Sequence, residues 1–158
     1  MIHRLYEKQS LLNQFVAELR DVNVQQDRMK FRTNLERIGQ IFAYEISKHL
    51  SYENCEVETP LGSAECGLSK DRIVLATILR AGLPIHNGLL SFFDNADNAF
   101  VSAYRQHHKD GTFEINMQYI TCPNIEDSIL IVSDPMLATG ASMKQSIDAL
   151  LELSLIHI

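Results

Sequence analysis

Two continuous apolar runs constrain the fold of this chain more than any other feature. Residues 72–79 (RIVLATIL) and 128–132 (SILIV) are short and rich in β-branched side chains. Such runs are typical of strands that are buried on both faces of a sheet. A turn and a stretch of helical character follow each run. Strands that alternate with helices predict an α/β domain around a mostly parallel sheet that helices flank.

Other segments add elements around this sheet. Apolar residues recur at helical spacing over 10–19 and 27–50, so we expect two N-terminal helices, with Ser10 as the cap of the first. Asp110-Gly111 is a hairpin signal and predicts a β-hairpin arm. The strands of this arm should cover residues 99–104 and 113–121. We expect further helices over residues 84–93 and 142–153, and one short extended piece over residues 56–62.

Composition limits the functions that this chain can have. The 158 residues suffice for a single domain, and a formal net charge of −6 argues against nucleic acid or an anionic membrane as a partner. The three cysteines have no CxxC spacing, which predicts reduced thiols rather than a disulfide framework or a zinc site. No stretch resembles a signal peptide or a membrane span. We therefore expect a cytoplasmic protein.

The segment after the second apolar run is the most informative one. The run leads Asp134 to the carboxyl edge of the sheet, where open α/β folds bind their ligands. A short loop then enters a helix N-terminus, whose N–H groups and dipole suit an anion. Thr139 and Ser142 add hydroxyl donors, and Gly140 allows close backbone approach. The Asp134 carboxylate can accept hydrogen bonds from two neighbouring ribose hydroxyls.

The common nucleotide-binding motifs do not fit this segment. Gly140 is followed by Ala141 and Ser142 without the lysine of a P-loop, and no GxGxxG is present. On the residues alone, an ordinary strand–helix connection with Thr139 or Ser142 as the N-cap explains the segment equally well.

A family resemblance favours the ligand site. Asp134–Gly140 (Asp-Pro-Met-Leu-Ala-Thr-Gly) resembles the phosphoribosyl pyrophosphate (PRPP) motif of uracil phosphoribosyltransferases. Residues 58–62 (Glu-Thr-Pro-Leu-Gly), 78–83 (Ile-Leu-Arg-Ala-Gly-Leu) and Tyr104-Arg105 resemble further segments of that family, in the family's order. One acid followed by Pro-Met-Leu distinguishes this subclass, since most relatives on the fold carry two adjacent acids.

The resemblance implies a type I phosphoribosyltransferase fold and transfer of a phosphoribosyl group from PRPP to uracil, which gives UMP and diphosphate. Arg80 and Arg105 would contact the diphosphate, and Asp134 would act as the catalytic residue at the ribose. Magnesium would arrive with PRPP rather than on protein ligands. The resemblance also implies a homo-oligomer and leaves activation by GTP open. The residues that it assigns to the ribose 5-phosphate are Asp134, Pro135, Met136, Leu137, Ala138, Thr139, Gly140, Ala141 and Ser142.

The chain departs from the family pattern at four places, one of which is residues 85–87 (Ile-His-Asn), where we assign no role to His86. Ser133 replaces an aliphatic residue, and Ala141 replaces a second glycine, which would weaken phosphate binding if that position needed a positive φ. Family members also continue into a Gly-Asp-Ala-Gly-Asp-Arg segment that recognises uracil, and residues 1–158 contain no such segment. We therefore expect a single phosphoribosyltransferase domain that lacks uracil-binding residues. A PRPP- or nucleotide-sensing regulatory protein of the same fold and an inactive fragment are the alternatives.

Overall fold

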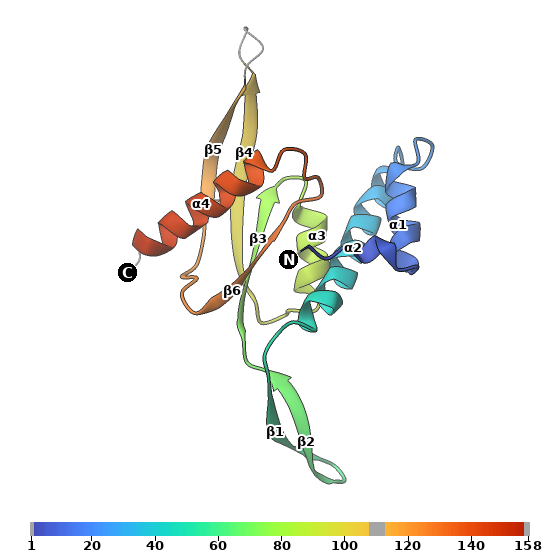
Figure 1. Cartoon of the computed structure of the whole chain (residues 1–158), viewed down its shortest axis with the longest axis vertical. Coiled ribbons are helices and arrows are strands. Elements are labelled where there is room, and N and C mark those ends of the chain that lie inside the picture. Colours follow the sequence, from blue (N-terminus) through green and yellow to red (C-terminus); the bar gives the residue numbers. More distant parts are fainter. Residues whose placement is uncertain (1, 108–112, 157–158) are drawn as a thin grey trace.

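The sheet at the centre of the molecule has four strands in the order β5-β4-β3-β6. A computed structural model describes residues 2–107 and 113–156, with the backbone alone for residues 103–107, 113–118 and 154–156. Strands β3 (Arg72–Leu79), β4 (Asp97–His107) and β6 (Ser128–Ser133) are parallel to one another. β5 (Phe113–Thr121) pairs antiparallel with β4, so the two strands of the predicted hairpin arm are confirmed, while the predicted turn at Asp110-Gly111 lies outside the described residues (Figure 1).

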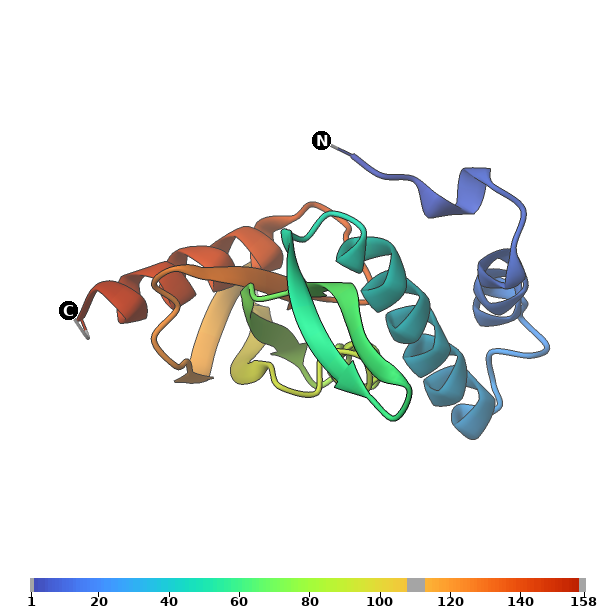
Figure 2. The ribbon, with the colours of Figure 1, turned by 90° about the horizontal axis from the view of Figure 1, so that it is seen from below.

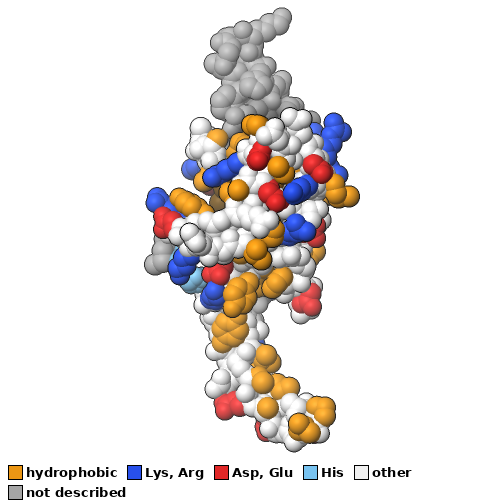
Figure 3. Space-filling view, turned by 90° about the vertical axis from the view of Figure 1, so that its right-hand side faces the viewer, with side chains coloured by type: hydrophobic (Ala, Val, Ile, Leu, Met, Phe, Trp, Pro, Cys, Tyr) orange, Lys and Arg blue, Asp and Glu red, His pale blue; other side chains and the backbone are white. Residues whose placement is uncertain are grey.

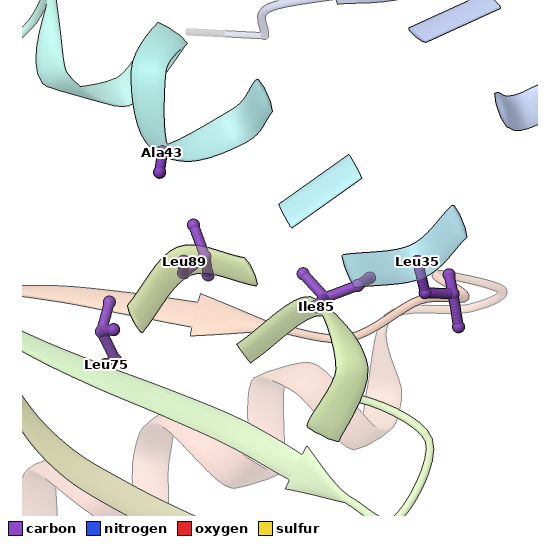
Figure 4. Packing of buried hydrophobic residues seen from close by; sticks show 5 residues of the cluster. All are labelled: Leu35, Ala43, Leu75, Ile85 and Leu89. Carbon is purple, nitrogen blue, oxygen red and sulfur yellow. The ribbon is translucent and has the colours of Figure 1, made fainter. Parts of the chain in front are cut away.

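Helices cover both faces of β3, which explains its continuous apolar run. Val74 and Ala76 pack with Leu150 of α4 (Ala141–Ile156), whereas Leu75 faces α3 (Leu83–Leu90). The second face carries a cluster that also includes residues of α2 (Arg28–Ser47), as Figure 4 shows. The members of this cluster are Leu35, Ala43, Leu75, Ile85 and Leu89. Alternating burial on two faces is the arrangement expected of a central parallel strand.

Two glycines let α2 and α3 approach closely. A Cβ atom added at Gly39 would contact the carbonyl oxygen of Ile85 and lie 3.1 Å from the Cα atom of Gly88. A Cβ atom at Gly88 would in turn contact the carbonyl oxygen of Glu36. Backbone therefore packs on backbone at this crossing, which holds α3 against the sheet.

The N-terminal segment forms both predicted helices, and α1 lies on the far side of α2. After the short 3₁₀ turn Leu5–Glu7, α1 (Leu11–Arg20) begins at Ser10, whose N–H donates to Asn13 Oδ1 at 3.1 Å. α1 lies beyond α2, away from the sheet (Figure 2). The Asp27 carboxylate accepts hydrogen bonds from two backbone N–H groups at the start of α2, as expected of an N-cap.

The segment expected as a short extended piece over residues 56–62 is longer and forms a hairpin. β1 (Tyr52–Thr59) and β2 (Gly62–Ser69) pair antiparallel and project from the body of the molecule (Figure 1). We name these residues, 52–69, the β1–β2 hairpin. Every residue of β2 is exposed. Ala64, Cys66 and Leu68 of β2 alternate with polar residues, but alanine and cysteine are small and give a weak apolar signal, so we predicted no strand over residues 63–69.

Candidate functional site

The ends of β3 and β6 bring two of the predicted ligand segments side by side. Thr77 of β3 lies opposite Ser133 of β6, and its buried hydroxyl donates to the Ser133 carbonyl oxygen at 3.2 Å. The Ser133 hydroxyl donates to the Ala76 carbonyl oxygen at 3.3 Å. Asp134 therefore leaves the sheet next to the last residues of β3. The loop that carries Arg80 begins at the same edge.

Ser133 shows how a polar residue fits a position where the resemblance led us to expect an aliphatic one. Its side chain is 6% exposed, and the hydrogen bond to the backbone of β3 satisfies the hydroxyl. Thr77, which is fully buried, makes the reciprocal bond. The two hydroxyls therefore link the strands at the point where the ligand loops begin.

The turn from β3 into α3 is very tight. The peptide bond between Leu79 and Arg80 is cis, and the Gly82 N–H donates to the Ile78 carbonyl oxygen at 3.0 Å. A Cβ atom at Gly82 would contact the Thr77 hydroxyl and would lie 3.0 Å from the Ser133 carbonyl oxygen. Any larger residue at position 82 would thus push the turn away from β6. The Arg80 side chain is exposed at the top of this turn.

The loop after β6 curls around a small hollow at the N-terminus of α4. The hollow has a volume of about 20 Å³ and is lined by Asp134 and residues 136–143, while Pro135 lies in the same loop outside the lining. Gly140 adopts φ 77°, a conformation that favours glycine. Among the described residues Asp127 is the one non-glycine residue with positive φ, so Ala141 has a negative φ. Position 141 therefore does not require a glycine. The expected cost of Ala141 is therefore absent.

Local interactions set the protonation of Asp134. The carboxyl group is half-buried, and this desolvation raises its pKa, while a hydrogen bond from the Met136 backbone N–H acts in the opposite direction. A carboxylate that has lost part of its hydration gains more from hydroxyl donors or a positive charge than an exposed one does. Asp134 is thus suited to a sugar diol or a developing cation.

Arg105 lies on the third element that reaches this edge. Ser102 of β4 pairs with Leu79, the last residue of β3, and Arg105 follows three residues later. Its backbone pairs with Ile115 of β5, beyond the end of β3. The described part of the structure does not include the Arg105 side chain, so the contact with diphosphate stays a prediction.

A buried histidine lies in α3, just after the turn that carries Arg80. His86 of α3 is 2% exposed, and its Nε2 atom lies 2.8 Å from Asn98 Oδ1 on β4. Because Asn98 Oδ1 only accepts, Nε2 carries the proton, and Nδ1 has no partner within the described residues. Desolvation lowers the pKa of His86, so the ring stays neutral. Sequence reasoning assigned it no role, since burial is not visible in a single histidine.

Two further observations concern the described residues, 2–107 and 113–156. They contain no group of three or more His, Cys, Asp or Glu side chains that could hold a metal ion. Within the same part of the chain, no helix has the length and apolar character needed to cross a membrane.

Known proteins resemble this chain over almost its whole length. A family model described as uracil phosphoribosyltransferase matches residues 6–157. A uracil phosphoribosyltransferase of Porphyromonas gingivalis is 55% identical over 151 residues, which are 96% of this chain and 69% of the relative. One of Thermococcus gammatolerans is 40% identical over 141 residues, which are 87% of this chain and 61% of the relative.

The fold also has a counterpart among solved structures. The structure of AQ2163 protein from Aquifex aeolicus superposes with a TM-score of 0.82 and 30% sequence identity. The match covers 96% of this chain and 70% of that protein. The predicted α/β architecture is therefore confirmed.

Proposed function

The chain belongs to the uracil phosphoribosyltransferase family, and from this premise we propose that it transfers the 5-phosphoribosyl group of PRPP to uracil, giving UMP and diphosphate. The observation that carries the proposal is the Thr77–Ser133 hydrogen bond. It sets the Arg80 turn and the loop that begins at Asp134 against each other, so one ligand can contact both.

The loop between Asp134 and α4 receives the 5-phosphate in this proposal. α4 has 16 residues, so its first N–H groups carry the positive end of a full helix dipole toward the hollow. Thr139 and Ser142 supply hydroxyl donors. Gly140, with its positive φ, turns the backbone around the phosphate.

Asp134 holds the two ribose hydroxyls and stabilises the transition state. As the bond between the anomeric carbon and diphosphate breaks, positive charge develops on the ribose ring. A fixed carboxylate that water only partly screens favours that charge more than it favours the neutral ground state. The raised pKa of Asp134 is the consequence of the same desolvation.

Arg80 and Arg105 bind the leaving diphosphate. Guanidinium groups suit this role, because their planar N–H donors pair with phosphate oxygens and stay charged. We propose that magnesium arrives bound to the diphosphate of PRPP, where it neutralises charge on the leaving group. The oxygen atoms of the ligand would supply its coordination, so this assignment needs no cluster of protein ligands.

We assign no residue of 1–158 to uracil and propose that these residues form one domain carrying the PRPP part of the site. We also propose, on the family resemblance, a homo-oligomer in the cytoplasm. Activation by GTP is testable in the same assay, by adding the nucleotide to the reaction. The assembly, the location and the activation by GTP rest on the family resemblance. The PRPP site rests on the contacts described above.

Calorimetric titration with PRPP and magnesium tests the proposal. Arg80→Gln should weaken binding by about 1–3 kcal/mol, the range for lost hydrogen bonds to charged groups. Arg32→Gln removes another exposed arginine, on α2, and should leave binding unchanged. If the parent chain showed no PRPP binding, or if both variants bound equally, the site would have to be placed elsewhere. UMP formation from uracil is then measured on this chain extended with the C-terminal part of the Porphyromonas gingivalis relative.

A further inference from the structure

Two cysteines face each other across the β1–β2 hairpin. Cys55 of β1 and Cys66 of β2 are direct partners in the antiparallel register, and both are free thiols. Side chains of directly opposed residues point to the same face of a hairpin. The Cα atoms of such pairs lie about 4.5 or 5.5 Å apart, and a disulfide needs roughly 4.4–6.8 Å. The register therefore brings the two sulfur atoms within bonding reach after side-chain rotation.

The surroundings of the pair favour reaction with a solute. Cys66 is exposed and Cys55 is half-buried. The Lys70 ammonium, next to the hairpin, lies 2.8 Å from Glu53 Oε2, and the Cys55 side chain is its second electrostatic neighbour. Both neighbours contribute to the raised pKa of Lys70, so this side chain stays charged. This positive charge attracts an anionic solute such as oxidised glutathione toward the pair.

We propose that Cys55 and Cys66 form a reversible cross-strand disulfide by exchange with a low-molecular-weight disulfide such as oxidised glutathione. The exposed Cys66 thiolate attacks one sulfur of glutathione disulfide, which forms a mixed disulfide and releases one glutathione thiolate. The Cys55 thiolate then attacks the Cys66 sulfur and releases the second glutathione. The two protein thiols lose two protons and two electrons in total, and the electrons reduce glutathione disulfide to two glutathione molecules.

The site of this modification explains what it would do. A two-stranded hairpin is marginally stable by itself, and every residue of β2 in the projecting β1–β2 hairpin is exposed. Figure 3 shows hydrophobic side chains along this projection; Tyr52, Leu61 and Leu68 of the hairpin are all exposed. A cross-link encloses residues 56–65, including the turn, and so removes open states of the β1–β2 hairpin. Oxidation would therefore keep the two strands paired, and reduction would let them separate.

Cys122 provides an internal control. It is half-buried and packs against the cluster between the sheet and α4, far along the chain from the hairpin. Burial raises the pKa of its thiol, which disfavours the reactive thiolate. We therefore expect the reaction to consume two of the three thiols of the chain and to leave Cys122.

Mass spectrometry of the intact chain after incubation with oxidised glutathione tests the proposal. The expected product is lighter by two hydrogen atoms, carries no glutathione and returns to the starting mass with dithiothreitol. Trypsin leaves both cysteines in one peptide, because residues 49–69 contain no Lys or Arg. A glutamate-specific protease cuts after Glu56, Glu58 and Glu65, so the two fragments must remain joined until reduction.

Single substitutions distinguish the steps. Cys55→Ser should trap one glutathione on Cys66, while Cys122→Ser should form the disulfide as fast as the parent chain. Lys70→Gln should slow the first step, because it removes the positive charge that attracts oxidised glutathione. A parent chain that retains glutathione on Cys66, a disulfide that includes Cys122, or a covalent dimer would each overturn the proposal.

Discussion

Replacement of Asp134 by asparagine should weaken ligand binding and leave folding almost unchanged, because it alters one atom of the side chain. Asn has the shape of Asp but carries no charge and offers one acceptor oxygen beside a donor nitrogen. The ribose diol would lose a hydrogen bond to a charged acceptor, and one hydroxyl would face an N–H group instead. The fold would lose little, since the side chain is half-buried and its hydrogen bond comes from the Met136 backbone N–H.

The expected magnitude on binding follows from the charged hydrogen bond. Loss of such bonds costs about 1–3 kcal/mol, which raises the Kd for PRPP by about 5- to 150-fold. UMP formation should fall further than binding, because the carboxylate also stabilises charge that develops only in the transition state. The Kd and the rate should therefore not change by the same factor.

The substitution weakens ligand binding, but it should not lower the stability of the fold at neutral pH. Desolvation raises the pKa of Asp134, so the folded chain holds this proton more tightly than the unfolded chain does. Above the ordinary value of 3.8 the unfolded chain loses the proton first, and the parent protein loses stability through the window up to the raised pKa. The Asp134→Asn variant lacks this loss, so at neutral pH it should be at least as stable as the parent.

Calorimetry with PRPP and magnesium and urea unfolding at two pH values measure both effects. Asp127→Asn is the matched control: it removes one carboxylate before β6, at the opposite end of the strand, and its φ of 51° is one that Asn tolerates. This control should leave the Kd unchanged. An Asp134→Asn variant with the parent's affinity would refute the role at the ribose. One that unfolds far more easily would refute the claim that Asp134 contributes little to the fold.

Three further predictions concern packing, protonation and activity. Gly39→Ala should destabilise the fold by about 1–3 kcal/mol in urea unfolding, because it forces α2 and α3 apart, whereas Gly67→Ala on the open hairpin should change little. His86→Gln should lose less stability than the parent when the pH falls below about 6.5. The lowered pKa of His86 means that the unfolded chain takes up this proton first; exposed His49→Gln is the control. Residues 1–158 should bind PRPP yet form UMP far more slowly than a chain extended with the C-terminal part of the Porphyromonas gingivalis relative, and comparable turnover would place uracil recognition within these residues.

Much of the fold was predictable from residues whose burial leaves a pattern. β3 was predicted with its bounds because both of its faces are covered, so no polar residue interrupts residues 73–76. β2 was missed because its alternating apolar residues, Ala64, Cys66 and Leu68, are mostly small and give a weak signal. The glycines of the α2–α3 crossing were also invisible as contacts. Their role depends on where another helix lies, which a single sequence does not encode in any local spacing.

The candidate site divides in the same way. Asp134, Gly140 and the start of α4 form one contiguous stretch, so a strand–loop–helix pattern and a family motif could locate them together. The supports came only from the structure: Thr77 lies 56 residues before Ser133 and yet shares a hydrogen bond with it. Gly82 reads in the sequence as one residue of a turn. Its true constraint is the closeness of Thr77 and Ser133, which leaves no room for a Cβ atom.

This division has a physical reason that bears on how such sites tolerate change. A motif residue meets the ligand, so the chemistry of the ligand limits its identity wherever the fold occurs. A support residue meets only its neighbours, so it can change if they change with it. Ser133 is such a case: the resemblance led us to expect an aliphatic residue there, and this chain has a buried hydroxyl that donates a hydrogen bond to the Ala76 carbonyl oxygen. Ser133→Ala should therefore cost little in PRPP affinity, whereas Gly82→Ala should displace the Arg80 turn itself.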